Sequence, residues 1–294
     1  MPAAGAEHAA NATTILVFGL RPERLIDSEG RIDAFVEPPG QEQVPVLVEA
    51  VRSGVQGGGS VVAIVPEWIG SEAIARVAMV RSILDTHRLA LYETALPPLA
   101  ATVLASLTSA CAPHAPSTGV LASLMPELEG ELHVFTWLGS VTGLSTPAPT
   151  FGQHIASLTP GSAFAVSSHP APAVHRIGGG DGVPVPQLTR PARLAVAPRG
   201  SGGADWIRDT LNPALGGLEL RQVEPTPGGQ TWWGTGKLVE AVAYPLDART
   251  LTGELVARLD PWTCRWCHEL VASSPCPLCG HRGRPARNRA VTPA

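Results

Sequence analysis

The chain has 294 residues, of which 44% are hydrophobic and 16% are charged, and its formal net charge is −4. These values allow a large core in two lobes or domains, and they exclude a global electrostatic attraction to nucleic acid or to acidic membranes. No apolar run reaches the roughly 18–20 residues of a membrane-spanning helix, and the N-terminus lacks a secretion signal, so we expect a cytoplasmic protein.

Apolar periodicity predicts alternating strands and helices in the first half of the chain. The β-branched run VVAIVP (61–66) is typical of a strand that is buried on both faces of a parallel sheet. Strands are expected at 13–20, 31–37, 61–66 and 89–92, and helices at 44–51, 71–87 and 98–110. This alternation favours an α/β lobe, because each crossover packs a helix back onto the sheet.

The second half repeats this pattern and suggests a similar second lobe. A hairpin is expected at 132–146 around Gly139, strands at 163–167, 193–197 and 218–224, and helices at 151–158, 204–215 and 238–244. The predicted parts are a flexible N-terminus (1–12), lobe I (13–130), lobe II (131–246), a linker helix (247–261), a cysteine ribbon (262–281) and a basic flexible tail (282–294).

Several stretches follow one another in the order of a known family. They are VVAIVPEWIG and the helix after it, YETA (92–95), LHVFTWLGSVTGLS (132–145), VAPRGSGGADWIRDTL (196–211) and GTGKLVEAVAY (234–244). This order resembles the actin, sugar kinase and DnaK-like chaperone ATPase superfamily, and best its DnaK-like branch. The resemblance covers residues 13–245 and implies a reduced two-lobed actin-like ATPase fold, with two ribonuclease-H-like lobes. It also implies a vestigial nucleotide cleft that contains Glu93, Gly139, Gly200, Ser201 and Gly234.

The chain departs from that family where the family binds magnesium. The two loops that should carry aspartates read FGLRP (18–22) and TWLGS (136–140). Phosphoryl transfer depends on a metal that is held by carboxylates. We therefore interpret the chain as a non-catalytic pseudo-ATPase scaffold in which ATP binding stays open. The alternative is an active ATP-binding chaperone-like or kinase-like protein with carboxylates from Asp181 or Asp205.

Other catalytic motifs have little support. The segment GQTWWGTGK (229–237) is not a Walker loop, because Thr231 and Leu238 stand where glycine and a hydroxyl residue are required. Trp232 and Trp233 in this segment are interpreted as packing residues. Cys111 lies in an alanine-rich helical stretch and is expected to be a small buried hydrophobic residue.

Four cysteines near the C-terminus have the spacing of a metal site. Cys264, Cys267, Cys276 and Cys279 form two C-x2-C pairs with eight residues between them. Four thiolates close the coordination of Zn²⁺, which predicts a structural zinc ribbon, with iron as the competing metal. Metal binding can fold a segment that has no core of its own, so we expect the ribbon to fold independently of the lobes.

Arginines follow the ribbon in HRGRPARNR (281–289). Glycine and proline between them prevent a helix, so they are expected on a flexible tail. The tail is interpreted either as solvated or as a contact to nucleic acid or an acidic protein. Together these features suggest a scaffold that presents its ribbon to a protein partner in a bacterial assembly, with nucleic-acid binding through ribbon and tail as the alternative.

Overall fold

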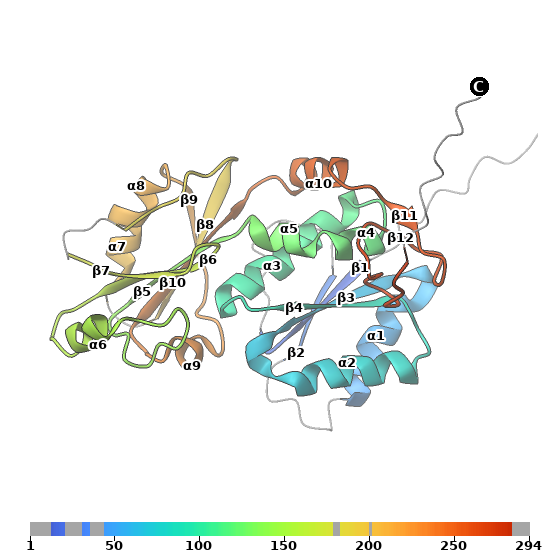
Figure 1. Cartoon of the computed structure of the whole chain (residues 1–294), viewed down its shortest axis with the longest axis horizontal. Helices are drawn as coiled ribbons and strands as arrows, with labels where there is room; N and C mark the ends of the chain where they lie inside the picture. The colour runs from blue at the N-terminus through green and yellow to red at the C-terminus, as the bar shows by residue number, and fades with distance from the viewer. Residues whose placement is uncertain (1–12, 21–30, 36–43, 179–182, 200–201, 284–294) are drawn as a thin grey trace, which may run out of the picture.

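The computed structural model describes residues 13–20, 31–35, 44–178, 183–199 and 202–283. In Figure 1, two sheets lie beside each other with one helix between them, and the ribbon lies at the far end of the first sheet. The predicted N-terminal segment, the last two residues of the FGLRP loop, Asp181, Gly200, Ser201 and the tail from residue 284 lie outside the described residues. None of the described helices is long and apolar enough to cross a membrane.

The first sheet is parallel throughout and has the strand order β2-β1-β3-β4. Its strands are β1 (Thr13–Phe18), β2 (Arg31–Phe35), β3 (Ser60–Pro66) and β4 (Leu89–Thr94). All seven residues of β3 are buried, as the VVAIVP run predicted. This sheet and the helices packed on it are called lobe I below.

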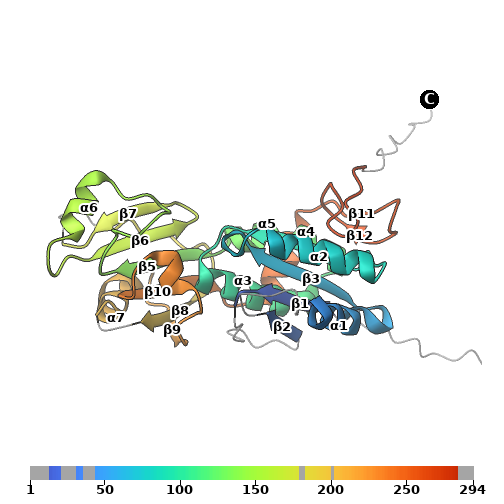
Figure 2. The ribbon, with the colours of Figure 1, turned by 90° about the horizontal axis from the view of Figure 1, so that it is seen from below.

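Helices cover both faces of the first sheet (Figures 1 and 2). One face packs on α1 (Val44–Val55) and α2 (Ser71–Ile83), and the other packs on α3 (Pro98–Cys111), α4 (Thr118–Ser123) and α5 (Met125–Gly130). Three short 3-10 turns complete lobe I: η2 (Gln56–Gly58), η3 (Glu67–Ile69) and η4 (Ala112–His114).

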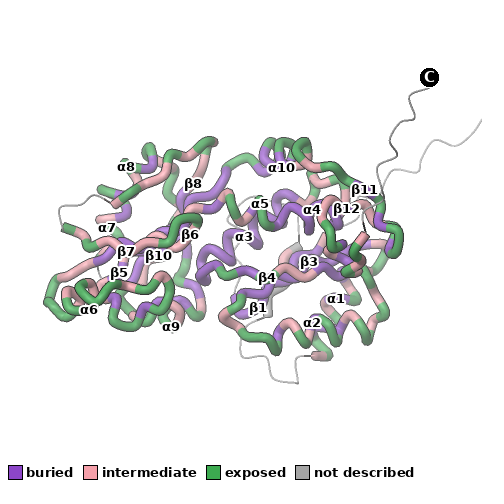
Figure 3. Tube along the Cα trace, in the orientation of Figure 1, coloured by how far each residue is buried: buried purple, intermediate pink, exposed green. Residues whose placement is uncertain are grey.

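Helix α3 is buried along its whole length between the two sheets (Figure 3). Its 14 residues include no charged side chain, and Pro98 occupies its first turn, where a missing N–H has no cost. The cluster of apolar side chains around α3 extends from β1 and β3 of lobe I to β8 and β10 of the second sheet. Cys111 at its end is fully buried, as predicted, and burial raises the pKa of its thiol to about 11.

The second sheet is mixed, with the order β7-β6-β5-β10-β8-β9, and only β8 and β9 pair in parallel. Its strands are β5 (His133–Leu138), β6 (Phe164–His169), β7 (Ala173–Arg176), β8 (Ala192–Arg199), β9 (Glu219–Gln222) and β10 (Leu238–Pro245). Its helices are α6 (Phe151–Ser157), α7 (Ala204–Trp206), the π-helical η5 (Ile207–Leu211), α8 (Asn212–Ala214) and α9 (Gly229–Trp233). This sheet and these helices are called lobe II below. The prediction of two similar parallel lobes is therefore wrong.

Residues 238–244 were predicted as a helix and instead form the central strand β10. Its side chains alternate between two clusters: Val239, Ala241 and Ala243 face η5, whereas Val242 and Tyr244 face α3. A strand produces this period of two, and both neighbours of β10 supply backbone hydrogen bonds. Residues 141–146 form no strand, so the predicted hairpin around Gly139 is also wrong.

The segment after β10 returns to lobe I. Asp247 caps α10 (Ala248–Ala257) by accepting a hydrogen bond from the Thr250 N–H at 3.0 Å. Leu251 and Leu255 of α10 belong to the apolar cluster around α3. The predicted linker helix therefore packs on α3 and η4 of lobe I.

Candidate functional site

The ribbon consists of two similar turns joined by a short antiparallel hairpin. The hairpin strands are β11 (Trp262–Thr263) and β12 (Leu270–Val271). In the first turn, the His268 N–H donates to the Cys264 carbonyl at 3.0 Å; in the second, the Gly280 N–H donates to the Cys276 carbonyl at 2.8 Å. Both donors have positive φ, 60° at His268 and 74° at Gly280. The two C-x2-C pairs therefore adopt the same local conformation.

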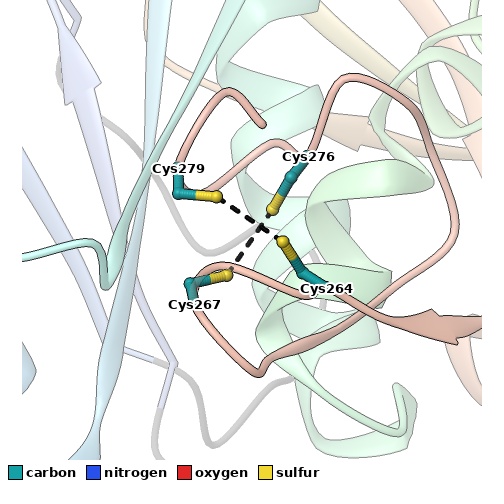
Figure 4. A group of neighbouring side chains, drawn as sticks. All are labelled: Cys264, Cys267, Cys276 and Cys279. Carbon is teal, nitrogen blue, oxygen red and sulfur yellow. Dashed lines mark hydrogen bonds between the residues drawn. The ribbon is translucent and has the colours of Figure 1, made fainter. Parts of the chain in front are cut away.

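The four sulfur atoms point toward one centre (Figure 4). The Cys264 and Cys279 sulfurs lie 3.6 Å apart, the Cys267 and Cys276 sulfurs lie 3.7 Å apart, and all four atoms lie within 4.8 Å of one another. A disulfide would need about 2.05 Å, whereas a tetrahedron with ~2.3 Å Zn–S bonds has edges of about 3.8 Å. The four cysteines can therefore bind a metal ion.

Backbone amides prepare this cluster for negative charge. Burial acts to raise the pKa of Cys264, but the N–H groups of Cys267 and Trp266 hold that pKa at about 7. Burial raises the pKa of Cys276 despite N–H groups of Cys279 and Leu278 that favour its thiolate. Burial thus favours the protonated thiol at Cys276, and a bound cation such as a metal ion would be needed to hold this residue as a thiolate. His268 is exposed and His281 is half-buried, and neither belongs to the sulfur cluster.

The ribbon packs closely on lobe I. The Ser117 hydroxyl donates to the Leu270 carbonyl at 2.7 Å, and the Ser123 hydroxyl accepts from the Ala272 N–H at 3.0 Å. A Cβ added to Gly119 of α4 would lie 2.4 Å from the Leu270 carbonyl oxygen, so only glycine permits this approach. Val271, Leu278 and three of the cysteines belong to the same apolar cluster as α3. The ribbon therefore shares the apolar cluster of lobe I, and its independent folding stays a prediction.

A second polar cluster lies between the lobes, around Glu240 of β10. Its side chain accepts hydrogen bonds from the Trp233 indole at 3.0 Å, the Thr226 hydroxyl at 3.0 Å and the Leu99 N–H, in the first turn of α3, at 3.3 Å. Burial raises the pKa of Glu240, and these three donors oppose that effect. Thr136, the cross-strand neighbour of Glu240 on β5, has a buried hydroxyl without a hydrogen-bond partner among the described residues.

A pocket of about 570 Å³ opens beside this cluster. Its lining is polar and rich in glycine: Arg199, Gly228, Gln230, Thr231, Gly234, Thr235 and Gly236. Arg199 is the charged residue of this lining, and it favours the ionised form of Glu240. Gly228 lies against lobe I, because a Cβ there would lie 3.5 Å from the Trp68 indole. The pocket is therefore at the junction of the two lobes.

The three described residues of the predicted nucleotide cleft do not gather at this pocket. Gly234 lines it, whereas Glu93 is exposed on β4 and Gly139 donates its N–H to the Lys237 carbonyl at 2.9 Å. Gly200 and Ser201 lie outside the described residues. Sequence reasoning missed Glu240, although one carboxyl residue inside the apolar run LVEAVAY is a signal for a buried functional or structural group.

No family model matches the sequence, and no curated protein sequence matches it. Solved structures do match its fold. DegV family protein Cg2579 from Corynebacterium glutamicum has a TM-score of 0.55 at 13% identity, covering 81% of this chain and 98% of that one. The fold is that of the DegV proteins. A stearic acid-binding protein from Eubacterium ventriosum has a TM-score of 0.55 at 12% identity, covering 80% of this chain and 99% of that one. DegV of Bacillus subtilis, described as a fatty acid binding protein, has a TM-score of 0.51 at 11% identity, covering 79% and 99%.

These likenesses correct the interpretation of fold and function. The chain does not have the actin-like or DnaK-like ATPase fold, so the inferred nucleotide cleft loses its basis. The prediction of a pseudo-ATPase scaffold is wrong for the same reason, and neither alternative function gains support. A protein partner, or nucleic acid at the ribbon and tail, stays a prediction.

Proposed function

We propose that this chain binds a long-chain fatty acid between its two lobes. The observation that carries the proposal is the apolar cluster around α3, which runs from one sheet to the other and ends beside a polar pocket. An acyl chain needs apolar surroundings, and its carboxylate needs donors or a cation. Structures of the same fold, such as the stearic acid-binding protein of Eubacterium ventriosum, support this ligand class.

Arg199 is the group that would hold the carboxylate. A guanidinium forms short charge-assisted hydrogen bonds with a carboxylate, and the glycines of the pocket allow close approach of the backbone. Glu240 nearby does not prevent this, because burial favours its neutral form. The described residues of the pocket lining include no histidine, cysteine or carboxylate, which favours binding over catalysis.

The ligand can be tested directly. Protein purified under native conditions is expected to release fatty acid on denaturation, as measured by mass spectrometry. After delipidation, stearate should raise the melting temperature. Arg199→Gln should weaken stearate binding by about 10- to 100-fold, because a hydrogen bond to a charged group contributes ~1.5–3 kcal/mol.

Arg208→Gln is the matched control. Arg208 is exposed on η5, pairs with Asp205 and Asp209, and is not part of the pocket lining. Its replacement should leave stearate affinity unchanged. Wild-type protein that neither carries nor binds any fatty acid would refute the proposal. Equal binding by both variants would instead refute the role of Arg199 alone.

We also propose that the four cysteines hold one structural Zn²⁺. Four thiolates complete a tetrahedral shell and leave no position for water or substrate. The ion would offset part of the thiolate charge in the apolar cluster and hold the two turns of the ribbon together. Metal analysis should find one zinc per chain; iron instead of zinc would correct the identity of the ion, and no metal would refute the site.

A further inference from the structure

Arg81, in the last turn of α2, reaches from lobe I to the second turn of the ribbon. One nitrogen of its guanidinium donates to the Leu89 carbonyl of β4 at 2.5 Å and also to the Leu278 carbonyl. Leu278 lies between Cys276 and Cys279, two of the four cysteines. The guanidinium is thus anchored on the edge strand of lobe I and faces the metal-binding turn.

Two carbonyl acceptors alone do not explain why a charged guanidinium is half-buried at this position. Its Nε is buried without a hydrogen-bond partner among the described residues. Burial lowers the pKa of Arg81, and negative charge on Cys279 and Cys276 opposes that effect. A half-buried guanidinium with an unbonded nitrogen is unfavourable unless negative charge lies close to it. Cys276 and Cys279, on either side of the Leu278 carbonyl that accepts from Arg81, would supply that charge as thiolates.

The charge of the metal site requires such a neighbour. Four thiolates and one Zn²⁺ carry a net charge of −2, and three of the four cysteines are buried. A buried charge is costly unless it is paired or hydrogen-bonded. Backbone N–H groups reach Cys264 and Cys276, but amides offset only part of a full charge.

The other arginine at this interface cannot serve the same purpose. Arg88 forms an ion pair with Glu269 of the ribbon at 3.6 Å and donates to the Gly58 carbonyl. Its charge is offset by that carboxylate, so the pair adds no net charge to the site. Arg88 therefore connects the ribbon to lobe I in the way Arg81 does, but without compensating the thiolates.

We infer that Arg81 completes the metal site from lobe I, by compensating the negative charge of the metal-bound cysteines. The inference rests on the proposed zinc site. The ribbon by itself supplies the four ligands, and lobe I supplies the outer positive charge that makes the thiolate cage stable. Arg81 is a positioning and charge-compensating residue and not a ligand. Its loss should weaken metal retention and make the thiolates more reactive.

The test compares Arg81→Gln, Arg81→Lys and Arg88→Gln in the full-length protein. Zinc affinity is measured by competition with a chromogenic chelator, and thiolate reactivity by the rate of iodoacetamide alkylation. Loss of an outer-shell partner typically reduces metal affinity by about 10- to 100-fold, which is the expected effect of Arg81→Gln. Arg81→Lys keeps the charge and should lose less. Arg88→Gln should change affinity by at most ~5-fold, as for a partly exposed ion pair.

Each outcome separates the inference from the proposed zinc site. Wild-type protein without metal refutes the zinc site itself. Wild-type protein with zinc, together with an unchanged affinity and alkylation rate in Arg81→Gln, refutes the role of Arg81. Equal losses in Arg81→Gln and Arg88→Gln, or in Arg81→Gln and Arg81→Lys, also refute it, because docking of the ribbon and not charge would then explain the effect.

Discussion

Lobe I forms two interfaces that bury polar groups in different ways. Against the ribbon, serine hydroxyls bond to backbone groups, and four sulfurs meet at one centre. Against lobe II, one carboxyl group, Glu240, accepts three hydrogen bonds. At the first interface a metal ion would replace the protons of the cysteine thiols, whereas Glu240 at the second becomes neutral only by binding a proton. Both the cysteine cluster and Glu240 border the apolar residues around α3. One apolar cluster can therefore contain a contact that depends on a metal ion, at the ribbon, and a contact that depends on a proton, at lobe II.

The largest effect is expected at the metal-dependent interface. Cys276→Ser should abolish metal binding and release the ribbon, which exposes Val271, Leu278 and the α4 surface beneath them. The full chain should lose roughly 3–6 kcal/mol, since truncation of large core side chains costs ~2–5 kcal/mol each. Urea unfolding followed by far-UV circular dichroism, with zinc content measured in parallel, checks this value.

Arg265→Ser is the control for that experiment. Arg265 is an exposed residue within the first C-x2-C turn, so its replacement should keep both zinc and stability. If Cys276→Ser loses zinc while the main unfolding transition stays in place, the ribbon is an independent unit after all. That result would show that the stability of lobe I does not depend on the metal ion in the ribbon.

The contact between the lobes should be weakened next by Glu240→Leu. Leucine leaves the Trp233 indole, the Thr226 hydroxyl and the Leu99 N–H without their acceptor. Unsatisfied buried groups cost ~1–3 kcal/mol each, so we expect a total loss of about 2–4 kcal/mol after the gain from apolar volume. Glu240→Gln keeps an acceptor oxygen and should lose about 1 kcal/mol or less. Equal effects of both substitutions in chemical denaturation would contradict the role of the carboxyl oxygens.

A pH series tests the proton dependence of the same contact. Burial raises the pKa of Glu240 above its ordinary value of 4.5. Between the two pKa values the folded state holds a proton that the unfolded state has released. The stability that neutral Glu240 contributes is therefore complete below pH 4.5 and is lost as pH rises through the folded pKa. Wild-type stability, relative to Glu240→Gln, should fall above pH 4.5 by up to about 1.4 kcal/mol per pH unit. A flat difference between the two proteins would show that Arg199 and the three donors fully compensate the charge.

Lobe I was predictable from the sequence because its signals are local. The run VVAIVP indicated a strand buried on both faces, and the alternation of helix and strand favoured a parallel sheet; the structure has both. The ribbon was predictable because the spacing of four cysteines limits the chemistry to a metal site. Neither signal carries information about docking. Gly119, Ser117 and Ser123 contact the ribbon from about 150 positions away in the chain, and only the tertiary structure reveals this.

Lobe II was not predictable in the same way, because antiparallel pairing joins distant segments. The run LVEAVAY fits a helix as well as a strand when β5 and β8 are unknown. The helix prediction hid the role of Glu240. In a strand, alternate residues share a face, so Glu240 lies with Val242 on the face toward α3. The family resemblance failed for a related reason. It rested on the order of short motifs along the chain, and that order contains no information about the direction in which neighbouring strands run.

The smallest effect is expected from the backbone of the two metal-binding turns. His268 and Gly280 occupy equivalent positions with φ of 60° and 74°, a region that costs a residue with a side chain about 1 kcal/mol relative to glycine. His268→Gly should therefore stabilise the ribbon by about 0.5–1 kcal/mol, and Gly280→Ala should destabilise it by a similar amount. No atom lies within 4 Å of a Cβ added to Gly280, so the second substitution measures backbone strain without steric contact. Hydrogen exchange of the ribbon amides in the metal-loaded protein would report both changes; a loss of protection in His268→Gly would mean that the imidazole itself stabilises the turn.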